Sequence, residues 1–109
     1  MMDKVAFFAD YLAKKPGDRF AMYSLALELA KTERWNDAEQ AFGSLLEVHP
    51  QSGAGHYQLG MLLSAQEKHE AALAAWRQGL ALLKGSSESE ARRSIVEIEA
   101  AIEDLLDDM

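Results

Sequence analysis

The sequence contains no cysteine, which excludes a disulfide-stapled scaffold and a metal site built from thiolates. Its two prolines, Pro16 and Pro50, both stand outside the stretches that have helical apolar spacing. No apolar run approaches the roughly 20 residues that a membrane-spanning helix requires, so no membrane partner is expected. The early acid at Asp3 and the lack of a small-residue cleavage site argue against a signal peptide. The expected compartment is therefore the cytoplasm.

Positive charge is also scarce, and the negative charge is unevenly spread. The chain has 11 lysines and arginines against 18 aspartates and glutamates, a formal net charge of −7. From Ser86 onward eight acids stand against Arg92 and Arg93, a net of −6, so residues 1–85 carry only −1. Because no basic stripe is available to neutralise phosphates, nucleic acid is not an expected partner.

What the sequence does contain is a pattern that recurs with a fixed period of thirty-four positions. Phe8, Phe42 and Trp76 are in step with one another, and Tyr23 is in step with Tyr57. Each period holds two helical stretches of apolar residues separated by a short polar break. The helices expected from this spacing are 3–15, 20–30, 36–48, 53–66, 70–83 and 87–106. The pattern therefore predicts a chain of helix–turn–helix units.

Several small residues mark the boundaries and crossings of these helices. Asp18, Ser52 and Ser86 are in step, and each is a favourable N-cap ahead of a helical stretch. Ser87, with a glutamate three residues later, is typical of a capping box that opens the last helix. Gly60 lies inside a helix, where glycine is unfavourable, so it indicates a tight helix crossing. Gly43 lies inside another helix, and its presence there has no explanation from the sequence.

The last helix differs from the others and is expected to end the array. Its narrow apolar stripe is expected to pack on the helix that contains Trp76 and Leu80. The stripe consists of Ile95, Ile98, Ile102 and Leu105. The segment beyond Ile102 is expected to overhang, with its acidic residues facing solvent and opposing the helix macrodipole.

The repeated helix–turn–helix unit resembles the tetratricopeptide repeat in its length, and the chain is similar to small bacterial-type members of that family. The residues that carry the resemblance are Leu25, Ala26, Ala38, Phe42 and Pro50 in the first unit and Leu59, Gly60, Ala72 and Trp76 in the second. The family implies an all-α fold, a right-handed superhelical stack of antiparallel helix pairs. The implied single domain, 1–109, has an N-terminal half-repeat helix (3–15), two repeats (19–52 and 53–86) and a C-terminal capping helix (87–107).

The same resemblance implies a function in protein–protein interaction. In the family, the first helix of each pair lines a concave groove that binds a peptide or helix of a partner protein. The positions expected there are Phe20, Tyr23, Leu27, Lys31, Tyr57, Met61 and Ser64. Independently of the family, the helix at 20–30 has one apolar stripe more than a single packed neighbour requires. The chain is thus predicted to be a scaffold with a nearly uncharged aromatic strip, suited to an amphipathic helix or apolar peptide.

Two other interpretations of the strip remain open. The protein can form a homodimer through the concave face or through the C-terminal helix. Alternatively, Tyr23, Tyr57 and Met61 can be covered by the chain's own last helix.

No convergent set of polar residues indicates catalysis, a cofactor or a metal. His49, His56 and His69 fall in different structural contexts, and no pair has the i, i+4 spacing of a helical zinc site. No glycine-rich phosphate loop is present, and the acids at 104–108 lack the glycine turn of a calcium loop. The chain is therefore predicted not to be an enzyme and to need no cofactor.

Overall fold

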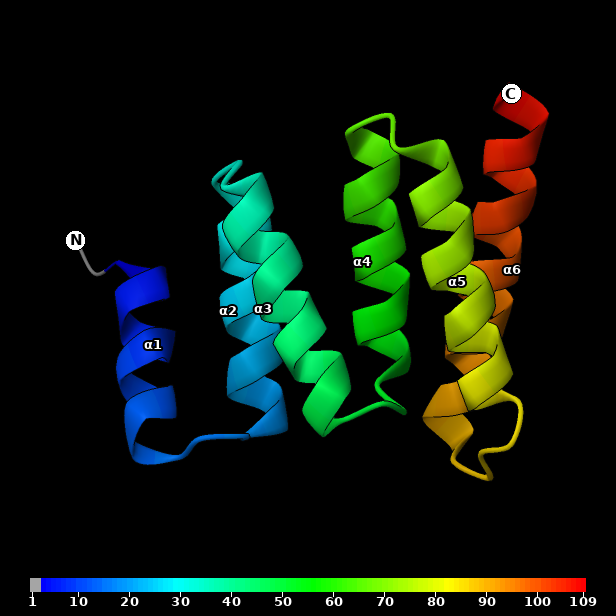
Figure 1. Ribbon diagram of the computed structural model, residues 1–109. Coiled ribbons are helices and arrows are strands. Elements are labelled where there is room, and N and C mark those ends of the chain that lie inside the picture. Colours follow the sequence, from blue (N-terminus) through cyan, green and yellow to red (C-terminus); the bar gives the residue numbers. More distant parts are fainter. Residues whose placement is uncertain (1–2) are drawn as a thin grey trace. The chain divides into compact units, whose positions relative to one another are not determined.

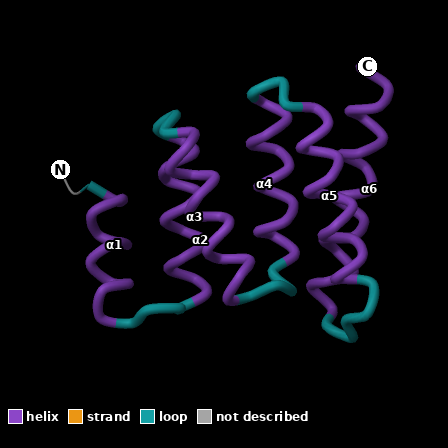
Figure 2. Tube along the Cα trace, in the orientation of Figure 1, coloured by secondary structure: helices purple, strands orange, loops and turns teal. Residues whose placement is uncertain are grey.

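The computed structural model describes residues 3–109, which form α-helices joined by short turns (Figures 1 and 2). The helices are α1 (Lys4–Lys14), α2 (Arg19–Lys31), α3 (Trp35–Val48), α4 (Gly53–Ala65), α5 (His69–Leu83) and α6 (Ser89–Asp108). No strand occurs within residues 3–109, so the all-α prediction is confirmed. The chain forms two compact units, Met1–Pro50 (unit 1, with α1–α3) and Gln51–Met109 (unit 2, with α4–α6).

The same helix–turn–helix geometry occurs in both units. α2 and α4 are each 13 residues long. The following helices, α3 and α5, begin one full period apart at Trp35 and His69. In each turn one glutamate has a positive φ, 59° at Glu33 and 62° at Glu67, and these two positions are also separated by one period. The period read from the sequence is therefore present in the backbone conformation of each unit.

The two turns also share their hydrogen bonds. The amide of Arg34 donates to the carbonyl of Leu29 at 2.9 Å, and the amide of Lys68 donates to that of Leu63 at 3.0 Å. In each turn the glutamate with positive φ lies just before the donating amide, and its left-handed conformation allows this hydrogen bond across six residues. The bond satisfies a carbonyl at the end of the first helix of the pair. Each pair thus turns back on itself over three residues without glycine.

Unit 1 is built around the α2–α3 pair, and α1 packs on α2. Asp18 caps α2 as expected, because its carboxylate accepts a hydrogen bond from the Ala21 amide at 2.9 Å. The ring nitrogen Nε2 of His49 lies 2.7 Å from the Gly17 carbonyl oxygen, which ties the end of α3 to the α1–α2 turn. The buried apolar residues of unit 1 are Ala21, Ala26, Leu29, Ala38, Phe42 and Leu45. α1 contributes no buried residue.

Unit 2 is built around the α4–α5 pair, and α6 packs against both helices. Its core cluster consists of Leu63, Ala72, Leu73, Trp76, Leu83, Ala91, Ile98, Ala101 and Leu105. The apolar stripe of α6 packs with Trp76 and Leu80, as predicted. The expectation that α6 overhangs from Ile102 onward is wrong at Leu105, which is only 6% exposed and belongs to the core, whereas residues 106–109 are exposed.

The start of α6 also differs from the prediction. Ser52 caps α4 by accepting a hydrogen bond from the Gly55 amide at 3.1 Å, but its counterpart Ser86 caps no helix. The Ser86 hydroxyl instead accepts from the Glu88 amide at 3.2 Å, and α6 begins only after Glu88, without a side-chain cap. The expected capping box at Ser87 is therefore absent. Hydroxyls that bond the backbone two residues ahead favour turns, which accounts for the later start.

The glycines inside helices fall into two kinds. A Cβ on Gly60 would come within 3.0 Å of three atoms of the Trp76 indole, so the predicted tight crossing is confirmed. A Cβ on Gly79 would similarly meet the His56 side chain. Around Gly43, in contrast, no atom other than those of its chain neighbours and its own helix backbone lies within 4 Å of the position that a Cβ would take. Close packing thus explains Gly60 and Gly79, and Gly43 has no packing role in the structure.

Candidate functional site

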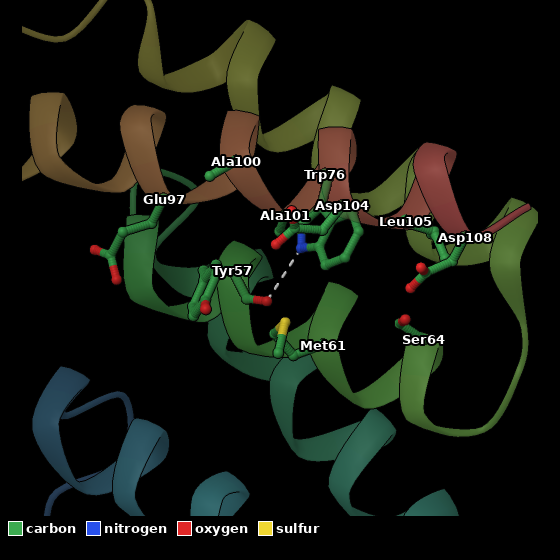
Figure 3. A pocket seen from close by; sticks show the side chains of 10 residues that line it. All are labelled: Tyr57, Met61, Ser64, Trp76, Glu97, Ala100, Ala101, Asp104, Leu105 and Asp108. Carbon is green, nitrogen blue, oxygen red and sulfur yellow. Dashed lines mark hydrogen bonds between the residues drawn. The ribbon is translucent and has the colours of Figure 1, made fainter.

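Unit 2 contains a cleft of about 340 Å³ that opens between α4 and α6 (Figure 3). Helix α4 contributes Tyr57, Met61 and Ser64 to its lining, and α5 contributes Trp76. The α6 side of the cleft consists of Glu97, Ala100, Ala101, Asp104, Leu105 and Asp108. The cleft therefore has one wall of aromatic and apolar side chains and one wall that carries carboxylates.

The floor of the cleft is fixed by a contact between α4 and α5. Trp76 is 1% exposed, and its indole N–H donates a hydrogen bond to the backbone carbonyl of Tyr57 at 3.1 Å (Figure 3). The indole reaches that carbonyl because Gly60, one turn further along α4, has no side chain to block it. Met61 stands at the mouth and is 41% exposed. The hydrogen-bonded Trp76 indole thus forms the floor of the cleft, and the Met61 thioether lies above it.

The α6 wall carries three acids on one helical face. Glu97, Asp104 and Asp108 are separated by seven and four residues, spacings that place side chains on the same side of a helix. The small side chains of Ala100 and Ala101 lie between them and leave the cleft open. In Figure 3, Glu97 lies toward the Tyr57 end of the cleft and Asp108 lies toward Ser64.

None of these three carboxylates has an ion-pair partner within residues 3–109. Ion pairs elsewhere in that part of the chain include those of Lys31 with Glu28 and of Arg34 with Asp37, both in unit 1. No lysine or arginine is among the residues of the 3–109 segment that line the cleft. The cleft therefore holds three exposed carboxylates without a direct ion-pair partner beside an apolar floor.

The structure brings three of the seven predicted site residues together in this cleft, namely Tyr57, Met61 and Ser64. The other four lie on α2 in unit 1. Phe20 is 72% exposed, Tyr23 and Leu27 are half-buried, and Lys31 is exposed. Tyr23 packs edge-on against the buried Phe42, with ring centroids 6.5 Å apart, and Lys31 pairs with Glu28 at 3.5 Å. That the α2 residues and the α4 residues form one continuous binding strip stays a prediction.

The acidic wall is what the sequence interpretation missed. The acids of the last helix were expected to form a solvated face, and Glu97, Asp104 and Asp108 are exposed, but the groove was expected to be nearly uncharged. α6 does not cover Tyr57 and Met61 completely, because Met61 remains 41% exposed and Tyr57 is half-buried. Instead, α6 stands beside them and contributes its carboxylates to the same cleft. The seven- and four-residue spacing of the acids was the signal that they share a face.

The histidines lie in separate structural contexts. His56 is 3% exposed within unit 2, and His49 holds the Gly17 turn in unit 1. Within residues 3–109, no group of three or more histidine, aspartate or glutamate side chains is arranged to hold a metal ion. Among the helices of this same part of the chain, none combines the length and the apolar character needed to cross a membrane.

Comparison of the sequence with models of protein families finds none that matches, and comparison with curated proteins finds no match. Function must therefore be inferred from the cleft and from the repeated helix pairs.

Proposed function

We propose that the chain is a protein–protein interaction module of the tetratricopeptide-repeat type, without catalytic activity or a cofactor. In this proposal the helix pairs belong to a right-handed superhelical stack, and a peptide or helix of a partner protein binds along the first helix of each pair. The observation that carries the proposal is the cleft beside α4, where Met61 is exposed above the Trp76 floor. The repeated turn geometry of α2–α3 and α4–α5 supports the family assignment.

The cleft is suited to receive one or two side chains of a partner. An apolar side chain that enters between Tyr57 and Met61 would leave water for an apolar surface, which typically contributes about 1.5–3 kcal/mol. The Trp76–Tyr57 hydrogen bond holds the floor in place before binding, which reduces the ordering cost of association. The Met61 thioether can change rotamer to fit different side chains. Such a site favours moderate affinity and some tolerance of sequence.

Replacing Met61 with glutamine tests this proposal without changing charge. Helical peptides selected from a displayed library against the wild-type protein are expected to bind Met61→Gln at least about fivefold more weakly, as for an apolar contact at an interface centre. The matched control is Val96→Gln, since Val96 is 63% exposed on α6 and does not line the cleft. Its affinity is expected to change less than about twofold. Equal affinities for both variants, or a selection that yields no peptides, would contradict the proposal.

Self-association is a second candidate function, favoured by the aromatic residues of unit 1. Phe7, Tyr11 and Phe20 are 48%, 39% and 72% exposed, although they are large apolar side chains. The centroid of the Phe8 ring lies 5.2 Å from the centroid of the Phe7 ring and 6.3 Å from that of the Phe20 ring, so these rings form one cluster. Exposed apolar clusters of this kind often mark contact surfaces between proteins.

Sedimentation velocity at several protein concentrations tests self-association. If unit 1 mediates a dimer, the weight-average mass rises with concentration toward twice the monomer mass. The double substitution Phe7→Ala and Phe20→Ala should then hold the protein at the monomer mass, because it removes most of the exposed aromatic surface. A wild-type protein that stays monomeric throughout would rule out this second function.

A further inference from the structure

The chemistry of the unit 2 cleft points to a particular kind of partner. We propose that its occupant is a basic amphipathic helix, which inserts an apolar side chain between Tyr57 and Met61 and places lysines or arginines beside the α6 carboxylates. This inference rests on the proposed function, because it identifies the ligand of that same cleft. It goes further in assigning the sign of the charge and the form of the ligand.

The sign follows from charge complementarity. The cleft wall holds Glu97, Asp104 and Asp108, its described lining has no basic side chain, and none of the three acids has an ion-pair partner within residues 3–109. Like-charge juxtaposition would penalise an acidic ligand, and a neutral ligand would leave the three charges uncompensated beside it. A basic ligand turns the same charges into attraction and also speeds encounter.

The end of α6 supports the same sign. The last turn of α6 contains no basic residue, and the carboxylates of Asp107 and Asp108 stand at its negative end. Anionic side chains at a helix C-terminus are unfavourable, whereas cations there are stabilising. A cationic partner that lies along α6 would therefore relieve repulsion within the helix as well as pair with the cleft acids. Binding is expected to strengthen the last turns of α6.

The helical form follows from the spacing of the acids. From Glu97 to Asp108 the helix rises about 16 Å, and the intervals of seven and four residues are those at which a second helix alongside presents one face. Glu97 and Asp104 stand about 10 Å apart along the axis, too far for one small cation to bridge. The charges of the ligand must therefore be distributed along a segment, with its apolar residue between them.

Three labelled peptides of about 16 residues, which span roughly 24 Å as a helix, test the proposal by fluorescence anisotropy. The first has one apolar and one basic face, the second replaces its lysines and arginines with glutamine, and the third scrambles the order of the first. The proposal expects the first to bind at least about fivefold more tightly than the other two at physiological ionic strength.

Two variants of α6 that each remove two negative charges show whether the cleft acids are responsible for binding the basic peptide. The variant with Asp104→Asn and Asp108→Asn removes two charges from the cleft wall. The control with Glu103→Gln and Asp107→Asn removes two charges from the same end of α6 but from its other face, which adjoins Leu80 and Leu106. The first variant should bind the basic peptide about fivefold or more weakly, and the control less than about twofold. Equal weakening by both would mean non-specific attraction and would overturn the proposal.

An internal spectroscopic control locates the peptide. The chain has two tryptophans, and only the Trp76 indole N–H lies at the cleft, bonded to Tyr57. Peptide binding should shift the Trp76 indole signal in a proton–nitrogen correlation spectrum and leave that of Trp35 unchanged. The signals are assigned with Trp35→Phe. A shift of the Trp35 signal alone would overturn the proposed location.

The remaining outcomes separate this inference from the proposed function. If the glutamine peptide binds as tightly as the basic one and its binding depends on Met61, the interaction module stands and the basic partner is rejected. If no peptide binds and library selection also yields none, both proposals fail. If a concentration-dependent dimer already occupies the cleft, shown by loss of the dimer in the Asp104→Asn and Asp108→Asn variant, the separate partner is rejected.

Discussion

Gly60→Ala is expected to lower the free energy of unfolding of unit 2 by about 3 kcal/mol, which corresponds to a fall in Tm of roughly 10–20 °C. The added methyl group would come within 3.0 Å of the Trp76 indole, so the indole must move away from α4. That movement breaks the hydrogen bond from the indole N–H to the Tyr57 carbonyl and disturbs the packing of a side chain that is 1% exposed. Thermal unfolding followed by circular dichroism measures the effect.

Gly43→Ala is the matched control, because it makes the same chemical change inside another helix. Apart from its chain neighbours and its own helix backbone, no atom lies within 4 Å of the new methyl group, so the expected effect is the helix-propensity gain of alanine over glycine, about 0.5–1 kcal/mol of added stability. The two substitutions should therefore have opposite signs. If Gly60→Ala also stabilised the protein, the close crossing of α4 and α5 would be refuted.

Phe42→Ala is expected to destabilise unit 1 by about 3–5 kcal/mol. Phe42 is 0% exposed in α3 and meets the Tyr23 ring of α2 edge-on, so its removal leaves a cavity between the two helices of the pair. The loss is large relative to the total stability of a small domain, and unit 1 is expected to lose its tertiary structure at moderate temperature. Chemical denaturation followed by Trp35 fluorescence reports on this unit, since Trp35 begins α3.

Phe20→Ala is the control that separates core from surface in the same unit. Phe20 is 72% exposed and touches the Phe8 ring only at its edge, so its removal should change stability by less than about 0.5 kcal/mol. A loss comparable with that of Phe42→Ala would show that Phe20 is buried in solution and would remove it from any binding surface.

The fold was largely predictable because the repeat makes its core residues recur. Phe42 and Trp76 stand one period apart, and both are buried between the helices of their pair, at 0% and 1% exposure. Gly60 was recognisable from the sequence because glycine inside a helix is unfavourable unless another residue needs its space. The start of α6 was not predictable, because two consecutive serines and a later glutamate fit both a capping box and a longer turn.

The candidate site was predictable only on the α4 side. Tyr57 and Met61 follow the repeat, so their place on the first helix of a pair could be read from the period. The acids Glu97 and Asp104 lie outside the repeat, and their proximity to Tyr57 depends on how α6 packs against α4. Local spacing placed Leu105 on the packed stripe of α6, but it did not show that α6 would also contact α4. Amphipathicity alone could not place the charged face of α6.

The left-handed glutamates in the two turns also affect how the sequence can change. Residues other than glycine typically lose about 1–2 kcal/mol in this conformation, so Glu33 and Glu67 each hold a reserve of stability that glycine would release. Both side chains are exposed, and Glu67 is not part of the cleft. A substitution that reshapes the cleft and lowers the stability of unit 2 could therefore be offset at Glu67 without altering the cleft lining. Each unit carries its own compensating position, so a destabilising change in one helix pair can be offset within the same pair.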